Sequence, residues 1–181
     1  MKTFFLTIGW VACLLISCSK NEDACERTVC KNGGQKLYNG TVCKCDCPAG
    51  FTGSDCSAYE LQAYVGTWTT SLANYGSGWN MTNFSCNCTG IFNAAEPMKL
   101  TLEIAILTNC PLGNSGDTVQ IHMNRLPEGS WPEMDIDAQV LSNGRSITDG
   151  YASISDGTTW LINISSGSPQ FPTTTDIQLH K

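Results

Sequence analysis

Apolar and polar side chains alternate in short runs over residues 57–181. Lys99–Ile106 is the clearest run, with an apolar side chain at every second position. A period of two predicts β-strands with one buried face, because successive side chains of a strand point to opposite sides of the sheet. The same pattern predicts strands at Thr118–Met123, Glu133–Val140, Trp160–Ile164 and Ile177–Leu179, and in Glu133–Val140 it places Met134, Ile136, Ala138 and Val140 on the apolar face.

Pairs of residues that favour tight turns separate these runs. They are Asn143-Gly144, Asp149-Gly150 and Asp156-Gly157, and such pairs accept the positive φ angles of two-residue hairpin turns. Residues 57–181 contain seven or eight strand signals and no helical period of useful length. We therefore expect a mainly β protein whose C-terminal domain, residues 57–181, is an antiparallel β-sandwich or a small β-barrel.

Residues 25–56 have a different pattern, with six cysteines in a short polar segment. Their spacing is C-x4-C-x12-C-x-C-x-C-x8-C. A segment of this size buries too little apolar surface to offset its chain entropy, so disulfides or a metal must stabilise it. Disulfides would indicate an oxidising compartment. Spacing alone does not choose among the possible cysteine pairings.

The end of this segment reads C-x-C-P-x-G-F-x-G-x-x-C from Cys45 to Cys56 and resembles the epidermal growth factor-like (EGF-like) module. The resemblance covers residues 25–56 and implies three disulfides, Cys25–Cys43, Cys30–Cys45 and Cys47–Cys56. Calcium-binding members of that family carry an acidic residue before the first cysteine and Asn or Asp between the third and fourth. This chain has Ala24 and Lys44 there. Structural zinc ligands are usually separated by two to four residues, which the C-x-C-x-C run does not provide. We therefore expect no metal and no cofactor.

The N-terminus carries Lys2 and then an apolar run from Phe4 to Ile16. The run is shorter than the roughly 18 residues of a membrane-spanning helix, so it predicts a secretory signal peptide at residues 1–17. Leu15-Ile16-Ser17-Cys18 resembles a bacterial lipobox, which implies cleavage before Cys18 and attachment of fatty acids such as palmitate to that residue. An ordinary secretory signal that happens to precede a cysteine is the alternative.

Residues 18–24 are expected to form an acylated polar tether. The partly acidic stretch Ser19-Lys20-Asn21-Glu22-Asp23 is similar to the segment that follows the acylated cysteine in surface lipoproteins of Bacteroidetes. This resemblance implies a lipid-anchored protein of the bacterial outer membrane that is exposed at the cell surface.

The formal net charge of the chain is −6, and no basic cluster occurs. Attraction to phosphates supplies most non-specific affinity for nucleic acid, so we expect no nucleic-acid partner. The same charge gives no attraction to anionic headgroups, and the membrane contact must therefore depend on the lipid.

Three further cysteines lie in the β domain. Cys86 and Cys88 are two residues apart and thus share a strand face, so either one could reach Cys110 but not both. We expect one disulfide among these three cysteines and one free thiol.

Tryptophans provide the candidate ligand contacts. Gly66-Thr67-Trp68 resembles the Gly-x-Trp entry motif of the lipocalins, which implies a ligand-holding barrel that the tryptophan closes at one end. The alternative is that Trp68 belongs to the core of another β architecture. Trp79 and Trp131 lie beside glycine or proline in loop-like sequence, where an exposed ring could contact a ligand.

The sequence lacks the common motifs of catalysis. No nucleophile elbow, zinc-protease motif, glycine-rich phosphate loop or glycosidase-like carboxylate pair occurs. His122 and His180 are expected to be solvated, and Asp135 and Asp137 are expected to lie on the solvent-exposed face of a strand. We therefore expect a protein without enzymatic activity.

The order of anchor, crosslinked spacer and β domain predicts a lipid-anchored envelope protein that displays a binding or adhesion domain. Its ligand would be an unidentified protein or glycan. A lipocalin-like carrier of small molecules is the alternative, and an envelope hydrolase with an unfamiliar site is the third hypothesis.

Overall fold

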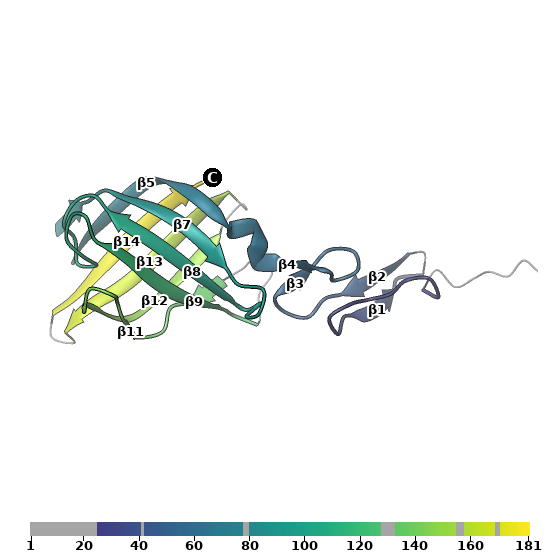
Figure 1. Ribbon diagram of the computed structural model, residues 1–181. Helices are drawn as coiled ribbons and strands as arrows, with labels where there is room; N and C mark the ends of the chain where they lie inside the picture. Colours follow the sequence, from purple (N-terminus) through teal and green to yellow (C-terminus); the bar gives the residue numbers. More distant parts are fainter. Residues whose placement is uncertain (1–24, 41, 78–79, 128–132, 155–157, 169–170) are drawn as a thin grey trace, which may run out of the picture.

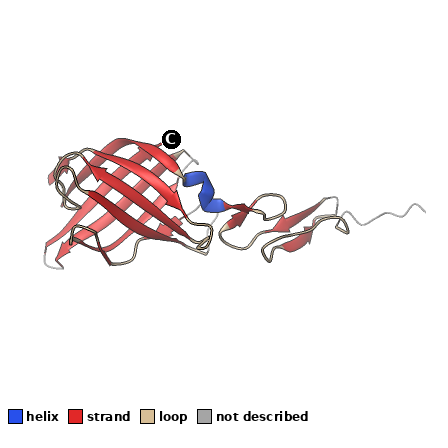
Figure 2. Ribbon diagram, in the orientation of Figure 1, coloured by secondary structure: helices blue, strands red, loops and turns tan. Residues whose placement is uncertain are grey.

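The computed structural model describes residues 25–40, 42–77, 80–127, 133–154, 158–168 and 171–181. The protein is mainly β and has two parts, a small disulfide-rich module and an eight-stranded antiparallel barrel (Figure 1). A short 3-10 helix joins them, as Figure 2 shows. In the part of the chain given above, no helix is long and apolar enough to cross a membrane.

The N-terminal module, residues 25–59, consists of two small hairpins. Strand β1 (Gln35–Tyr38) pairs with β2 (Cys43–Asp46), and β3 (Phe51–Thr52) pairs with β4 (Ala58–Tyr59). The sequence placed the end of the module at Cys56, whereas the β3–β4 hairpin continues to Tyr59.

Three disulfides crosslink the module: Cys25–Cys43, Cys30–Cys45 and Cys47–Cys56. This is the pairing that the EGF-like resemblance implies. Gly34 permits the close packing of two bridges, because a Cβ at this position would lie 2.7 Å from Cys56 Sγ and 3.3 Å from Cys30 Cβ.

The barrel is built from strands that follow one another in both sequence and space. They are β5 (Gly66–Ser77), β7 (Cys86–Phe92), β8 (Lys99–Ile106), β9 (Thr118–Arg125), β10 (Glu133–Asp135), β12 (Ser146–Ile154), β13 (Thr159–Ser168) and β14 (Phe171–His180). Every neighbouring pair is antiparallel. Strand β10 pairs with both β9 and β12, and β14 pairs with β5, so the sheet closes on itself. Of the two predicted architectures, the domain therefore adopts the barrel.

Two short strands lie outside this circuit. Strand β6 (Asn80–Asn83) pairs with the end of β5, and β11 (Gln139–Val140) pairs with the start of β12.

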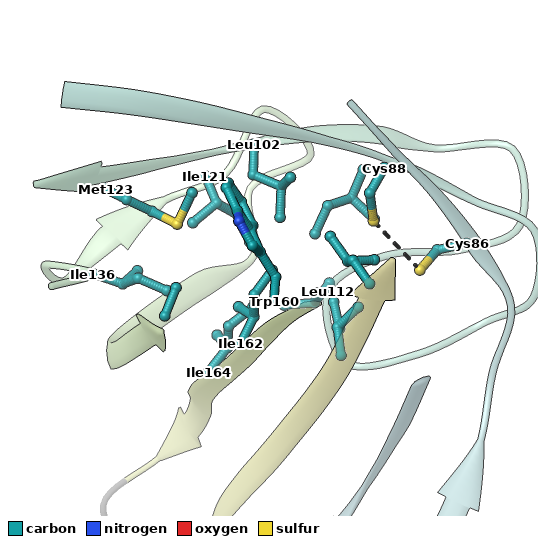
Figure 3. Packing of buried hydrophobic residues seen from close by; sticks show 14 of the residues in the cluster. Cys86, Cys88, Leu102, Leu112, Ile121, Met123, Ile136, Trp160, Ile162 and Ile164 are labelled. Atoms are coloured by element: carbon teal, nitrogen blue, oxygen red, sulfur yellow. Dashed lines mark hydrogen bonds between the residues drawn. The ribbon is translucent and has the colours of Figure 1, made fainter. Parts of the chain in front are cut away.

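The barrel core follows the predicted alternation. In β8 the residues Leu100, Leu102, Ile104 and Ile106 are all buried, and their neighbours are exposed or half-buried. Inward-pointing residues of β9, β13 and β14 complete the same cluster, part of which is drawn in Figure 3.

The prediction of one strand over Glu133–Val140 is wrong in its second half. Strand β10 ends at Asp135, and although Met134 and Ile136 are buried, Ala138 and Val140 are exposed. The Gln139 side chain accepts a hydrogen bond from the His122 backbone N–H and donates one to its carbonyl. The amide thus occupies the backbone groups that a continuing strand would pair with.

One of the predicted turns is also wrong. Asn143-Gly144 does form a turn, with a φ of 83° at Gly144, but Asp149-Gly150 lies inside β12 beside a bulge. Glycine is required there for close packing, since a Cβ at Gly150 would lie 2.5 Å from the carbonyl oxygen of Asn163. The Asp156-Gly157 pair lies outside the described residues.

The module and the barrel are joined through η1 (Glu60–Tyr64), whose Leu61 and Tyr64 are buried in the barrel core. The Tyr59 ring lies 5.4 Å from Phe51 in the module and 5.3 Å from Phe92 in the barrel. The Arg125 guanidinium, only 6 % exposed, donates two hydrogen bonds to the Glu60 carboxylate, of 3.1 and 3.2 Å. These contacts fix the module to one end of the barrel.

Candidate binding surface

The barrel interior beneath Trp68 is occupied by other aromatic side chains. The Trp68 ring is 1 % exposed, and its Nε1–H donates to the Tyr64 carbonyl oxygen at 3.0 Å. Its centroid lies 5.0 Å from the ring of Trp160, which in turn lies 5.5 Å from Tyr64. Lys181 Nζ lies 5.3 Å from the Trp68 centroid, within cation–π range. Trp68 therefore belongs to a packed aromatic layer at this end of the barrel.

The three cysteines of the barrel are free thiols, and the predicted disulfide among Cys86, Cys88 and Cys110 is not formed. Cys86 and Cys88 both point inward from β7, with 3.8 Å between their sulfurs (Figure 3). Their Cα atoms are two strand residues apart, about 6.6 Å, near the upper limit for a disulfide. Cys110 is held in a separate turn by backbone hydrogen bonds to Gly113 and by the Arg145 guanidinium.

The pKa values of two of these thiols are raised, which disfavours their thiolate forms. The pKa of the Cys88 thiol is raised by its hydrogen bond with Cys86 and by burial, and burial raises the pKa of Cys110. The hydrogen bond from Cys88 lowers the pKa of Cys86, but that sulfur is also enclosed in the core. In the described ranges no group of three or more His, Cys, Asp or Glu side chains could hold a metal ion.

Of the histidines and acidic residues considered from the sequence, His180 lies on β14, whereas His122, Asp135 and Asp137 lie near one another around β9 and the end of β10. His122 Nδ1 lies 3.0 Å from Thr101 Oγ1, and His180 Nδ1 lies 3.1 Å from Thr159 Oγ1. Asp135 and Asp137 are exposed, as predicted. Asp137 accepts a hydrogen bond of 2.7 Å from Asn124 Nδ2. The two histidine contacts link neighbouring strands, and the Asn124 contact joins β9 to the segment after β10.

Three residues predicted to carry function lie outside the described ranges. They are the lipidation residue Cys18 and the candidate ligand contacts Trp79 and Trp131.

An open groove of about 300 Å³ is found instead on the outer wall of the barrel, over β5, β12, β13 and β14. Its centre is a row of outward-pointing residues that are direct cross-strand neighbours. The row runs Tyr151, Asn163, Asp176, Asn74. The two inner members are each flanked by buried residues of their own strand, namely Ile162 and Ile164 around Asn163, and Thr175 and Ile177 around Asp176. The alternation that buries the core therefore also creates this polar row.

Hydrogen bonding within the row is incomplete. Asn163 Nδ2 donates to Asp176 Oδ1 at 2.6 Å. The neighbouring Asn74 Oδ1 is buried but accepts no hydrogen bond. A buried acceptor without a partner costs about 1–3 kcal/mol, so a donor from a ligand would be favourable at this point.

Apolar side chains border the polar row. Leu72, Met81 and Leu161 line the groove and are 43 %, 43 % and 44 % exposed. In the next row of the sheet Gln178 lies between Leu161 and Leu72. Tyr151, in the same polar row, is 58 % exposed, and its other cross-strand neighbour is Asp135 of β10. The groove thus combines one exposed aromatic ring, planar polar groups and an apolar border.

Sequence reasoning did not find this groove. Asn163 and Asp176 alternate with isoleucines, and every half-buried strand carries polar residues in that manner. Their juxtaposition depends on the register of strands that are about a hundred residues apart in the chain, as for Asn74 and Asp176, and no local signal reports it.

In comparisons with known proteins, no family model matches this chain and no curated protein matches it.

Proposed function

We propose that this protein is a lipid-anchored envelope protein that binds an external ligand on the outer wall of its β-barrel. Support for the anchor comes from the sequence alone, namely the apolar N-terminal run and the lipobox-like segment that ends at Cys18. The same resemblances suggest the surface of a bacterial outer membrane as the location.

The outer groove is the single observation that carries the binding function. It gathers exposed aromatic and amide side chains from four strands, and it leaves a buried acceptor, Asn74 Oδ1, without a partner. Small-molecule sites commonly have volumes of about 300–1,000 Å³ with a few placed polar groups, and this groove lies at the lower end of that range.

The N-terminal module suits the role of a stiff spacer. Three disulfides fix its shape, and the stacked rings of Phe51, Tyr59 and Phe92 fix its junction with the barrel. A spacer of this kind would hold the groove away from the lipid at a defined orientation.

The experiment for this function is made on the mature protein from its native membrane. We expect an intact mass that starts at Cys18 and carries fatty acids, partition into the detergent phase, and labelling of intact cells by a membrane-impermeant amine reagent. The matched control is Cys18→Ser, which should abolish acylation and detergent partition. A mature product that starts at another residue, carries no fatty acid and stays in the aqueous phase would contradict the proposal.

A lipocalin-like carrier is the second candidate, and the barrel topology favours it. The chain forms an eight-stranded up-and-down barrel with Gly66-Thr67-Trp68 on its first strand. The volume beneath Trp68, however, holds the Trp160 ring at 5.0 Å. Titration with a fluorescent fatty acid tests this candidate, because an interior ligand would quench Trp68 and Trp160, whereas a ligand in the outer groove would leave both buried indoles unquenched.

A further inference from the structure

We infer that the outer groove binds a neutral oligosaccharide, an assignment that rests on the proposed function and names its ligand class. The groove offers the two kinds of group that a sugar ring requires. Tyr151 presents a broad apolar face, and the polar row beside it presents hydrogen-bonding groups at regular spacing.

The hydrogen-bonding capacity of the row matches hydroxyl groups. A hydroxyl both donates and accepts, a carboxylate accepts only, and an amide does both. Asp176 and Asn74 Oδ1 can accept from sugar hydroxyls, and the Asn74 and Asn163 amides can donate to them. The unpartnered Asn74 Oδ1 is an acceptor that a ligand hydroxyl would satisfy.

Charge in the groove argues against an anionic ligand. Among the described residues that line it, Asp176 is the sole charged side chain, and neither lysine nor arginine occurs. Recognition of phosphate, sulfate or carboxylate groups relies on Arg, Lys or helix N-termini. Asp176 would instead repel such groups, so the favoured ligand carries no negative charge.

Size argues against a protein ligand. A stable protein interface buries at least about 1,000 Å², whereas the groove is an open hollow of about 300 Å³. Neighbouring strands are about 4.8 Å apart, so the row of four residues extends over about 14 Å. These dimensions suit a short, extended ligand that lies across the strands.

Tyr151 provides the central test, because its ring is exposed and carries no core packing. The full acylated protein is purified in a detergent without a sugar headgroup and applied to an array of neutral and acidic oligosaccharides, and hits are titrated by calorimetry. We expect neutral oligosaccharides to bind. Tyr151→Ala should lower their affinity about tenfold or more, as truncation of an aromatic anchor does. Tyr151→Trp should retain binding. The matched control is Tyr38→Ala, since Tyr38 in β1 is also 58 % exposed.

The polar row is tested with a second matched pair. Asn163→Ala removes the donor to Asp176 in the groove, and Gln120→Ala removes the donor to Glu103 between β9 and β8, away from the residues that line the groove. Only Asn163→Ala should weaken binding of the oligosaccharide. Urea denaturation of each variant verifies that the barrel remains folded.

Three results would overturn the inference. They are the absence of any neutral oligosaccharide among the hits, binding restricted to acidic glycans, and binding that Tyr151→Ala and Asn163→Ala leave unchanged. If the protein is nevertheless acylated and labelled at the cell surface, the proposed function still stands and only the assigned ligand class is wrong. Conversely, the protein could carry no fatty acid, stay in the aqueous phase and still bind neutral oligosaccharides. The proposed anchor would then be wrong, and the assignment of the groove would stand.

Discussion

The N-terminal module and the barrel are stabilised in opposite ways. Every side chain of β1 is exposed, and of the hydrophobic side chains described in the module only Cys56 is buried. In β8, by contrast, Leu100, Leu102, Ile104 and Ile106 are all buried, and the barrel keeps its three cysteines as thiols. The module therefore depends on crosslinks and the barrel on apolar packing. Loss of a disulfide should destabilise the module only, and loss of a core side chain should destabilise the barrel only.

The largest effect is expected from Trp160→Ala. Trp160 is fully buried against Trp68 and Tyr64, and loss of a large core side chain costs about 3–5 kcal/mol. Urea denaturation followed by tryptophan fluorescence should show this loss for the barrel, and amide exchange in the module should not change. Leu161→Ala, which alters the neighbouring outward-facing residue, is the control and should stay within about 1 kcal/mol. Equal losses in both variants would contradict the division into core and outer face.

Removal of one bridge should act on the module alone. The double variant Cys30→Ser/Cys45→Ser opens the disulfide between β2 and the segment before β1. A native disulfide of a small domain contributes about 2–4 kcal/mol, so amide exchange in residues 25–59 should accelerate strongly while the barrel keeps its urea midpoint. Mild reduction of the unaltered protein should reproduce this result. A lowered barrel midpoint would show that the barrel depends on the bridges.

The junction should respond with a smaller loss. Glu60→Gln leaves the Arg125 guanidinium buried without its carboxylate, and its Nη1 already lacks a partner. Because the Glu60 side chain is 23 % exposed, we expect a loss of about 1–3 kcal/mol in barrel stability. The double variant Glu60→Gln/Arg125→Met should recover part of it, as measured by urea denaturation. Additive losses in the double variant would indicate that the two residues are not coupled.

The smallest effect concerns pH. Hydrogen bonds from Ser57 and Lys31 lower the pKa of Asp55 to about 2 from its ordinary value of 3.8. The folded module therefore releases this proton more readily than the unfolded chain, and the resulting stabilisation is present above about pH 4 and is lost as the pH falls toward 2. Asp55 is exposed to solvent, so the change should be slight. Asp55→Asn should remove this part of the acid sensitivity from amide exchange in the module, and an unchanged profile would contradict it.

The parts of the fold that follow local alternation could be predicted, and those that depend on distant contacts could not. Strand β8 has the bounds expected from its pattern because both its neighbours continue the same pairing. The run after Asp135 has the same alternation, yet Gln139 hydrogen-bonds to His122 across the sheet and ends the strand. Pairing of the module cysteines could be anticipated from a known framework, whereas the state of Cys86, Cys88 and Cys110 depends on their positions in three dimensions. The groove depends on register between β5 and β14, which lie at opposite ends of the domain sequence.

Pairing of β5 with β14 has a consequence for biogenesis. The first strand of the barrel finds its partner in the last one, some hundred residues later in the chain. Because the module precedes the barrel in the chain, its cysteines are all present before the barrel can close, which requires the last strand. Until then the edge of β5 and the three reduced thiols remain accessible, so this interval is when the growing polypeptide most needs a chaperone.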